Sequence, residues 1–172
     1  MGIANYCYNK SHAATYSYIS IMTAWLKKYY PVQFMSAVLS MSNEDKRKKY
    51  MSICEQSMNI KISTPDINLS QKSFTPNQNN ILYGISSVKG VGESSLIDII
   101  QNRPYKNLED ALNKIPKKSF NKRVPINLIK SGAFDFEDSN RYNLINKFYD
   151  LRKEKDERYD PNSYNEFVCM QF

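Results

Sequence analysis

The feature that most constrains the fold of this chain is a short turn in which two glycines flank one apolar residue, Gly90-Val91-Gly92. Because glycine lacks a Cβ atom, we expect Gly90 and Gly92 to adopt left-handed backbone conformations that other residues avoid. Val91 is expected to point back and pack between the helices on either side. An ordinary glycine turn between two helices is the alternative interpretation of so short a motif.

The backbone of this turn is expected to be bare, and the next helix to begin at about Glu93 with its first N–H groups unpaired. A nucleic-acid phosphate can accept hydrogen bonds from such groups without any base being recognised. This pattern is typical of a helix-hairpin-helix phosphate grip, with a lysine before the turn adding charge. The residues predicted to contact DNA are Lys89, Gly90, Val91, Gly92 and Ser94.

A second helical unit follows at residues 121–134, without the glycine pattern of the first. Asn121 can cap a helix there, and Gly132 can end it in a left-handed cap. The inward-facing residues of this helix are expected to be Val124, Leu128 and Ile129. We expect this unit to pack against the first hairpin and to add further DNA contacts. The residues predicted to provide them are Lys122, Arg123, Lys130 and Gly132.

The charge balance favours a polyanionic partner. The chain has 24 Lys and Arg against 17 Asp and Glu, which gives a formal net charge of +7 and an isoelectric point of about 9.2. No apolar run approaches the roughly 20 residues of a membrane span, and no export signal opens the chain. We therefore expect no membrane partner and a cytoplasmic location.

The sequence predicts no complete active site and no metal site. The three cysteines, Cys7, Cys54 and Cys169, lack the paired spacing of zinc ligands, and His12 is the only histidine. Phosphate-binding loops of the Walker type, dinucleotide fingerprints and clustered carboxylate pairs are also missing. We expect the chain to bind no cofactor by itself.

The chain divides into four zones, and the predicted fold class is mainly α. These zones are a helical segment at residues 1–58, a polar connector with short strands at 59–84, a tandem helix-hairpin-helix at 85–136, and a C-terminal helix with a charged tail at 137–172. Weak order is expected beyond Glu157.

Apolar residues in the first zone recur at helical spacing. The stripe consists of Tyr18, Ile21, Met22, Trp25, Leu26 and Tyr29, and it stops near Pro31. A stripe of this kind is most often the buried side of a helix. We therefore expect it to be core.

Five blocks, in order along the chain, closely resemble the alpha subunits of bacterial replicative DNA polymerase III, the C-family polymerases. The blocks lie at residues 8–14, 23–35, 65–68, 83–92 and, as a last block in two parts, 121–123 with 128–135. The resemblance covers roughly residues 3–135. It implies the last part of the fingers domain of that family, followed by its tandem helix-hairpin-helix domain.

Family members polymerise DNA with two metal ions held by aspartates of the palm domain. Those aspartates fall outside the matched region. The resemblance therefore implies a polymerase fragment or subunit, from a split gene or a phage, that is inactive alone and works with Mg²⁺ only in the complete enzyme. The implied partners are duplex DNA and the palm and early fingers on another chain, in the cytoplasm of a bacterium or of a phage-infected cell.

The resemblance also places the residues around Asn9 where the fingers approach the incoming nucleotide. Lys10 and His12 carry donors suited to triphosphate oxygens. Ser11 can cap the following helix and direct its N-terminus at the same charge. These three residues are the predicted nucleotide-binding group.

Two functions of other classes remain open at this stage. One is a freestanding DNA-binding remnant that works without a polymerase partner. The other is an interaction protein or decoy, for example a phage product that acts on a host factor.

Overall fold

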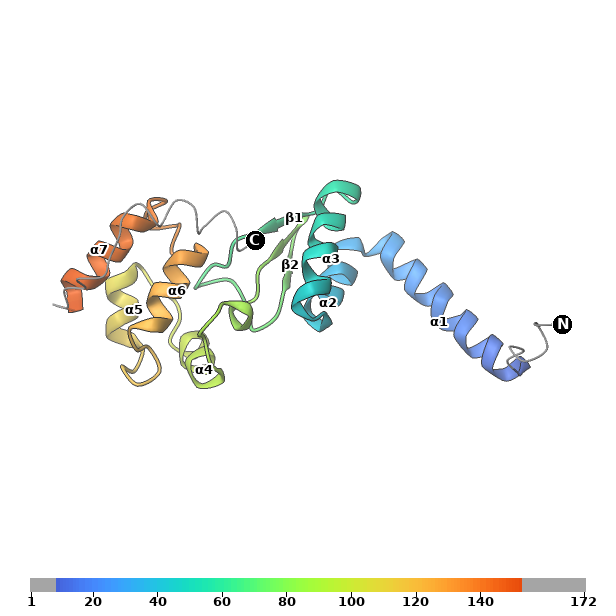
Figure 1. The fold of residues 1–172 in the computed structure, drawn as a ribbon, viewed down its shortest axis with the longest axis horizontal. Helices are drawn as coiled ribbons and strands as arrows, with labels where there is room; N and C mark the ends of the chain where they lie inside the picture. The colour runs from blue at the N-terminus through green and yellow to red at the C-terminus, as the bar shows by residue number, and fades with distance from the viewer. Residues whose placement is uncertain (1–8, 153–172) are drawn as a thin grey trace.

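The computed structural model describes residues 9–152, and most of them are helical (Figure 1). The helices of this part are α1 (Lys10–Tyr29), α2 (Pro31–Met41), α3 (Glu44–Ser57), the 3-10 helix η2 (Ile85–Ser87), α4 (Glu93–Gln101), α5 (Leu108–Lys114), α6 (Arg123–Ser131) and α7 (Arg141–Arg152). The predicted mainly α class is confirmed. The tail expected beyond Glu157 lies outside the described residues.

The connector holds a small three-stranded sheet with the order β1-β3-β2. Its strands are β1 (Lys61–Ser63), β2 (Thr75–Asn77) and β3 (Asn80–Leu82). Strand β3 lies in the middle, parallel to β1 and antiparallel to β2. Pro76 lacks an N–H group and lies on an edge strand, where a missing donor is tolerated. The sheet is therefore short but regularly paired.

A first hydrophobic core joins this sheet to α2 and α3. Its buried members are Val32, Met35, Leu39, Cys54, Ile60, Phe74 and Ile81. The buried hydroxyl of Ser36 donates to the carbonyl oxygen of Phe74 at 2.6 Å, which ties α2 to the strand region. The connector is thus packed against the helices that precede it.

A second and larger core lies among α4, α5, α6 and α7. Its fully buried large side chains include Ile99, Leu108, Phe120, Leu128, Phe134 and Phe148. Ile67 of the connector and Ile85 of η2 belong to the same cluster. The C-terminal helix α7 contributes Leu144, Ile145 and Phe148, so it is part of this unit.

Helix α1 forms as expected, but its apolar stripe is not buried. Tyr18 is 66% exposed, Ile21 69% and Trp25 50%, and none of the residues of α1 is buried. The helix projects away from the body of the molecule, and α2 is its main neighbour (Figure 1). The prediction that this stripe is core is therefore wrong, because its side chains stay exposed although α2 lies next to the helix.

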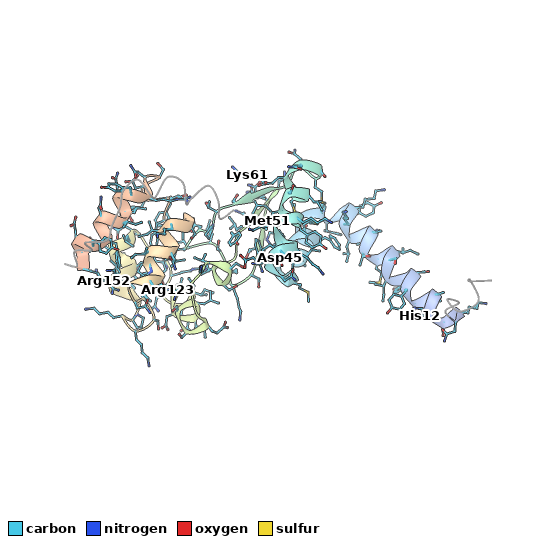
Figure 2. All side chains as sticks on the ribbon, in the orientation of Figure 1. His12, Asp45, Met51, Lys61, Arg123 and Arg152 are labelled. Carbon is cyan, nitrogen blue, oxygen red and sulfur yellow. The ribbon has the colours of Figure 1, made fainter. Side chains whose placement is uncertain are left out.

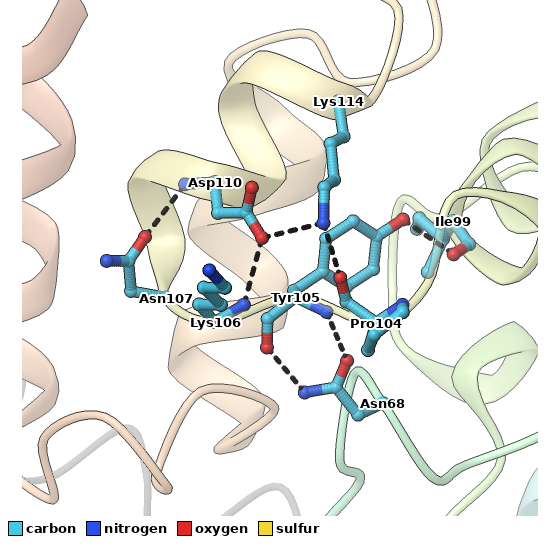
Figure 3. Close-up of polar contacts among 8 residues, drawn as sticks. All are labelled: Asn68, Ile99, Pro104, Tyr105, Lys106, Asn107, Asp110 and Lys114. Carbon is cyan, nitrogen blue, oxygen red and sulfur yellow. Dashed lines mark hydrogen bonds and ion pairs between the residues drawn. The ribbon is translucent and has the colours of Figure 1, made fainter.

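A hydrogen-bond network fixes the segment between α4 and α5 (Figure 3). Asn68 of the connector donates to the carbonyl oxygen of Tyr105 at 2.9 Å and accepts from its N–H at 2.8 Å. The Tyr105 hydroxyl donates to the carbonyl oxygen of Ile99 at 2.6 Å, and burial raises the pKa of Tyr105 to about 12. Lys114 donates to the carbonyl oxygen of Pro104 at 2.6 Å. These bonds hold the end of α4 against the connector.

Within residues 9–152, no helix combines the length and the hydrophobicity needed to cross a membrane.

Candidate nucleic-acid interface

The glycine turn, residues 88–92, links η2 to α4. Gly90 has a φ of +89°, as expected for a glycine that reverses the chain. The Val91 N–H donates to the carbonyl oxygen of Val88 at 3.2 Å, which closes the turn. Val91 is partly buried and packs against the second core, as the sequence predicted.

Gly92 differs from the expectation. Its φ is −84° and its ψ is 169°, an extended conformation, and it is the N-cap of α4. The prediction of a left-handed Gly92 is wrong because an N-cap residue has an extended backbone while its carbonyl already accepts the first helical bond, here from the N–H of Leu96 at 2.9 Å. A Cβ atom at Gly92 would meet nothing within 4 Å. The space in front of this residue is therefore open.

The first turn of α4 presents hydrogen-bond donors to that open space. The first N–H groups of a helix have no partner within it, and Gly92 has no side chain that could cap them. Ser94 is exposed on this first turn and adds a hydroxyl, and Lys89 is exposed just before it. The helix dipole makes the same end favourable for an anion. These groups together suit a phosphate.

Helix α6 closes on the same turn from the other side. The side-chain amide of Asn127 donates to the carbonyl oxygen of Lys89 at 2.6 Å. A Cβ atom on Gly90 would come within 2.8 Å of Asn127 Nδ2 and 2.9 Å of Arg123 Nε. Arg123 is exposed, so its guanidinium group lies beside the turn and faces solvent. The second unit therefore supplies a cation to the surface built by the first.

The start of α6 follows the sequence prediction. The Asn121 side chain accepts hydrogen bonds from the N–H groups of Arg123 at 3.1 Å and Val124 at 3.4 Å. Tyr149 belongs to α7, and the ammonium group of Lys122 lies 5.0 Å from the centre of its ring, in a cation–π contact. Lys122 therefore belongs to the packing between α6 and α7 as well as to the basic end of α6.

The other end of α6 lies away from the turn. Gly132 ends the helix with a φ of +92°, the left-handed cap that the sequence predicted. A Cβ atom on Gly132 would come within 2.5 Å of Arg141 and 2.6 Å of Asp135. These two side chains form an ion pair with each other at 2.8 Å. Lys130 is half-buried, and burial lowers its pKa. Gly132 has a conformational role here. Neither Lys130 nor Gly132 is brought to the glycine turn.

Two residues near the turn were not found from the sequence. Asn127 is one, because its hydrogen bond to Lys89 joins positions far apart in the chain. Lys72 of the connector is the other, since it pairs with Glu93 at 2.5 Å and both side chains are exposed. Lys72 places a positive charge against the only acidic residue of the first turn of α4. No periodicity or motif in the sequence marks either residue.

The predicted nucleotide-binding group lies at the start of α1, at the opposite end of the molecule from Arg123 (Figure 2). The cap of this helix is Asn9, whose side chain accepts from the His12 N–H at 2.8 Å and from the Ser11 hydroxyl at 2.9 Å. The prediction that Ser11 caps the helix is wrong because α1 already begins at Lys10. The His12 ring lies 4.4 Å from that of Tyr16.

Across residues 9–152, no group of three or more His, Cys, Asp or Glu side chains is placed to hold a metal ion.

A turn of this geometry between two packed helices is the defining element of a class of nucleic-acid-binding motifs. A family model described as "Helix-hairpin-helix motif" matches residues 59–144. The match spans half of the chain, and the chain belongs to the helix-hairpin-helix family.

The chain is also similar to DNA polymerase III subunit alpha from several bacteria. It is 41% identical to the subunit of Deinococcus radiodurans over 138 residues, which cover 77% of this chain and 10% of the relative. It is 42% identical to the Thermus aquaticus subunit over 137 residues, which cover 77% of this chain and 11% of that relative. It is 38% identical to the subunit of Escherichia coli K12 over 161 residues, which cover 90% of this chain and 14% of that relative. The resemblance to these subunits is confirmed, and the chain spans between 10% and 14% of their length.

Proposed function

We propose that this chain grips the phosphate backbone of duplex DNA through the glycine turn and Arg123, as part of a polymerase of the DNA polymerase III alpha type. The observation that carries this proposal is the position of Arg123, whose Nε atom lies 2.9 Å from the point that a Cβ atom of Gly90 would occupy. A cation and a bare backbone turn thereby share one surface.

The grip needs no recognition of bases. Phosphate oxygens accept hydrogen bonds from the first N–H groups of α4, and the charges of Lys89 and Arg123 strengthen those bonds. Phosphate contacts fix the position of a protein on DNA without reading its sequence. Affinity should therefore be modest, nearly independent of sequence and strongly dependent on salt.

The polymerase setting rests on the relatives. Because the chain spans only a small share of their length, the palm aspartates and the Mg²⁺ that they bind are proposed to belong to the rest of such an enzyme, in a bacterial cytoplasm. Within that enzyme, Lys10, Ser11 and His12 are proposed to lie near the incoming nucleotide. The chain alone should then add no nucleotides to a primer.

A salt titration with a short fluorescent duplex tests the DNA grip. Lys89→Ala and Arg123→Ala should each lower the slope of log affinity against log salt by about 0.9, the value for one lost phosphate contact. Lys48→Ala is the matched control, since Lys48 is an exposed lysine of α3, outside the helix-hairpin-helix unit. Equal slopes for the wild type and all three variants would rule out the proposed surface.

A further inference from the structure

An ion pair joins the connector to the start of α4, directly after the glycine turn. The ammonium group of Lys72 lies 2.5 Å from a carboxylate oxygen of Glu93, the first residue of α4. Both side chains are more than half exposed, and exposed pairs of this kind contribute little to stability because water screens the charges. Stability alone is therefore a weak explanation for this pair.

The backbone around Lys72 is fixed against η2. The carbonyl oxygen of Lys72 accepts hydrogen bonds from the Ser86 N–H at 3.1 Å and from the Ser86 hydroxyl at 2.6 Å. The carbonyl oxygen of Gln71 accepts another from the Ile85 N–H at 3.0 Å. Gly84 allows this close approach, because a Cβ atom there would come within 2.7 Å of the Lys72 carbonyl oxygen. These contacts use only the backbone of Lys72, and they position its side chain beside α4.

Glu93 stands where a carboxylate would compete with a phosphate. Acidic side chains at a helix N-terminus are attracted by its unpaired N–H groups and by the helix dipole. Gly92, the N-cap residue, has no side chain that could shield these groups. A carboxylate that turned onto them would occupy the place proposed for a phosphate. In the structure the Glu93 carboxylate accepts a hydrogen bond from Lys72 of the connector.

We propose that Lys72 is a positioning residue of the DNA grip, which holds the Glu93 carboxylate away from the first N–H groups of α4 and neutralises its charge. The N–H groups and the positive end of the helix dipole then remain available to a phosphate. Lys72 itself contacts no phosphate in this arrangement. The inference rests on the phosphate-binding surface proposed above.

The physical basis is the repulsion between two anions at short range. Without Lys72, the carboxylate of Glu93 is unpaired beside the incoming phosphate. Like charges placed together across an interface disfavour the complex, and the repulsion grows as DNA displaces water from between them. Loss of Lys72 should therefore lower DNA affinity through Glu93, and the loss should disappear when Glu93 is neutralised as well.

The alternative is that Lys72 releases Glu93 and binds a phosphate directly. That exchange gains one favourable contact but leaves an unpaired carboxylate against the DNA. The positioning role keeps Lys72 and Glu93 paired in the complex, so no charge is left without a partner. The electrostatic balance therefore favours positioning over direct contact.

A double-mutant cycle on the full chain, with a short fluorescent duplex, tests the positioning role. At low salt, Lys72→Ala should weaken binding about fivefold, the effect of two like charges about 4 Å apart in water. In the Glu93→Gln background the same substitution should change the affinity by less than about twofold, because no carboxylate remains to be positioned. Glu93→Gln alone should bind at least as tightly as the wild type.

The salt dependence gives a second readout. The slope of log affinity against log salt should stay close to the wild-type value for Lys72→Ala, whereas Lys89→Ala should lower it by about 0.9. Lys48→Ala again controls for the loss of one exposed positive charge outside the helix-hairpin-helix unit. Circular dichroism should show an unchanged fold for every variant of the exposed pair.

Two results would overturn the positioning role. An equal loss of affinity for Lys72→Ala with Glu93 or with Gln at position 93 would show that Lys72 contacts a phosphate itself. Unchanged affinity in both backgrounds would show that the ion pair has no part in DNA binding. In either case, reduced salt slopes for Lys89→Ala and Arg123→Ala would leave the DNA grip intact. Wild-type slopes for these two variants would instead reject the grip, and the inference from Lys72 with it.

Discussion

The amide of Asn127 holds the carbonyl oxygen of Lys89 at 2.6 Å, so a residue of α6 fixes the backbone of the glycine turn. The bond satisfies one carbonyl group of the turn and uses no backbone N–H group of the turn. It also keeps Arg123, one turn earlier on the same helix, next to Gly90. The proposed phosphate-binding surface is therefore built by two helical units together.

Removing this bond should loosen the turn without changing its charge. Asn127→Ala is expected to weaken duplex binding several-fold, because a typical hydrogen bond of this kind contributes about 1 kcal/mol. The slope against salt should stay that of the wild type, since no phosphate contact is deleted. Fluorescence anisotropy at several salt concentrations measures both quantities. A lower slope would mean that Asn127 itself contacts a phosphate.

The two glycines of the turn should respond differently to substitution. Gly90→Ala should lower the free energy of unfolding by at least about 1–2 kcal/mol, the cost of a left-handed conformation for an L-residue, and its Cβ atom would also press on Asn127 and Arg123. Gly92→Val should leave the fold intact, because the backbone there is extended and the space is open. It should nevertheless weaken DNA binding by filling that space.

Urea unfolding followed by circular dichroism, together with duplex binding, separates these two effects. Strong unfolding of Gly92→Val would contradict the open environment of this residue. Normal DNA affinity for a folded Gly92→Val protein would show that phosphate does not approach the turn at that point.

Tyr105 should make the fold sensitive to alkaline pH. Its pKa is raised from 10.0 to about 12 by burial, so the unfolded chain loses the proton first as pH rises. The stabilising contribution is complete below about pH 10 and is lost as pH rises through about 12. Tyr105→Phe cannot ionise, and it also loses the hydrogen bond to Ile99.

The difference in stability between the wild type and Tyr105→Phe isolates this residue from the other tyrosines. At about pH 9 the free energy of unfolding of the wild type should exceed that of Tyr105→Phe by about 1 kcal/mol. By about pH 11 this lead of the wild type should be smaller by about 1 kcal/mol. Urea unfolding at the two pH values measures it. A lead that is the same at both values would show that Tyr105 ionises normally.

The residues at the start of α1 should affect nucleotide use and leave DNA binding alone. In an enzyme reconstituted with the remaining polymerase parts, Lys10→Ala or His12→Ala should raise KM for nucleotides or lower kcat. Duplex affinity should not change, because these residues lie at the far end of the molecule from the turn (Figure 2). Steady-state kinetics and anisotropy provide the two measurements, and parallel losses in both would mark the residues as structural.

Local patterns predicted the local parts of this molecule well. The cap by Asn121 and the left-handed Gly132 both follow from residue types next to a helix. The extended Gly92 was open to the same reasoning, because an N-cap residue is extended whether or not it is glycine. The rest of the predicted fold class came from the resemblance to known polymerases.

The missed features depend on contacts between distant residues. The approach of α6 to Gly90 is set by how two helical units pack, and spacing along the chain does not encode it. The exposure of the α1 stripe has a similar cause, since periodicity identifies the apolar side of a helix and not what covers it. The exposed Trp25 shows this limit most directly.

The connector crosses between the two cores more than once. The chain leaves the first core at Ile60, reaches the second at Ile67, returns to the first at Phe74 and Ile81, and enters the second again at Ile85. Three segments of the chain therefore join the two cores, whereas a single linker would let the cores rotate freely. Three connections should make the two cores move as one body, so a force applied at the glycine turn would be expected to reach α2 and α3 as well.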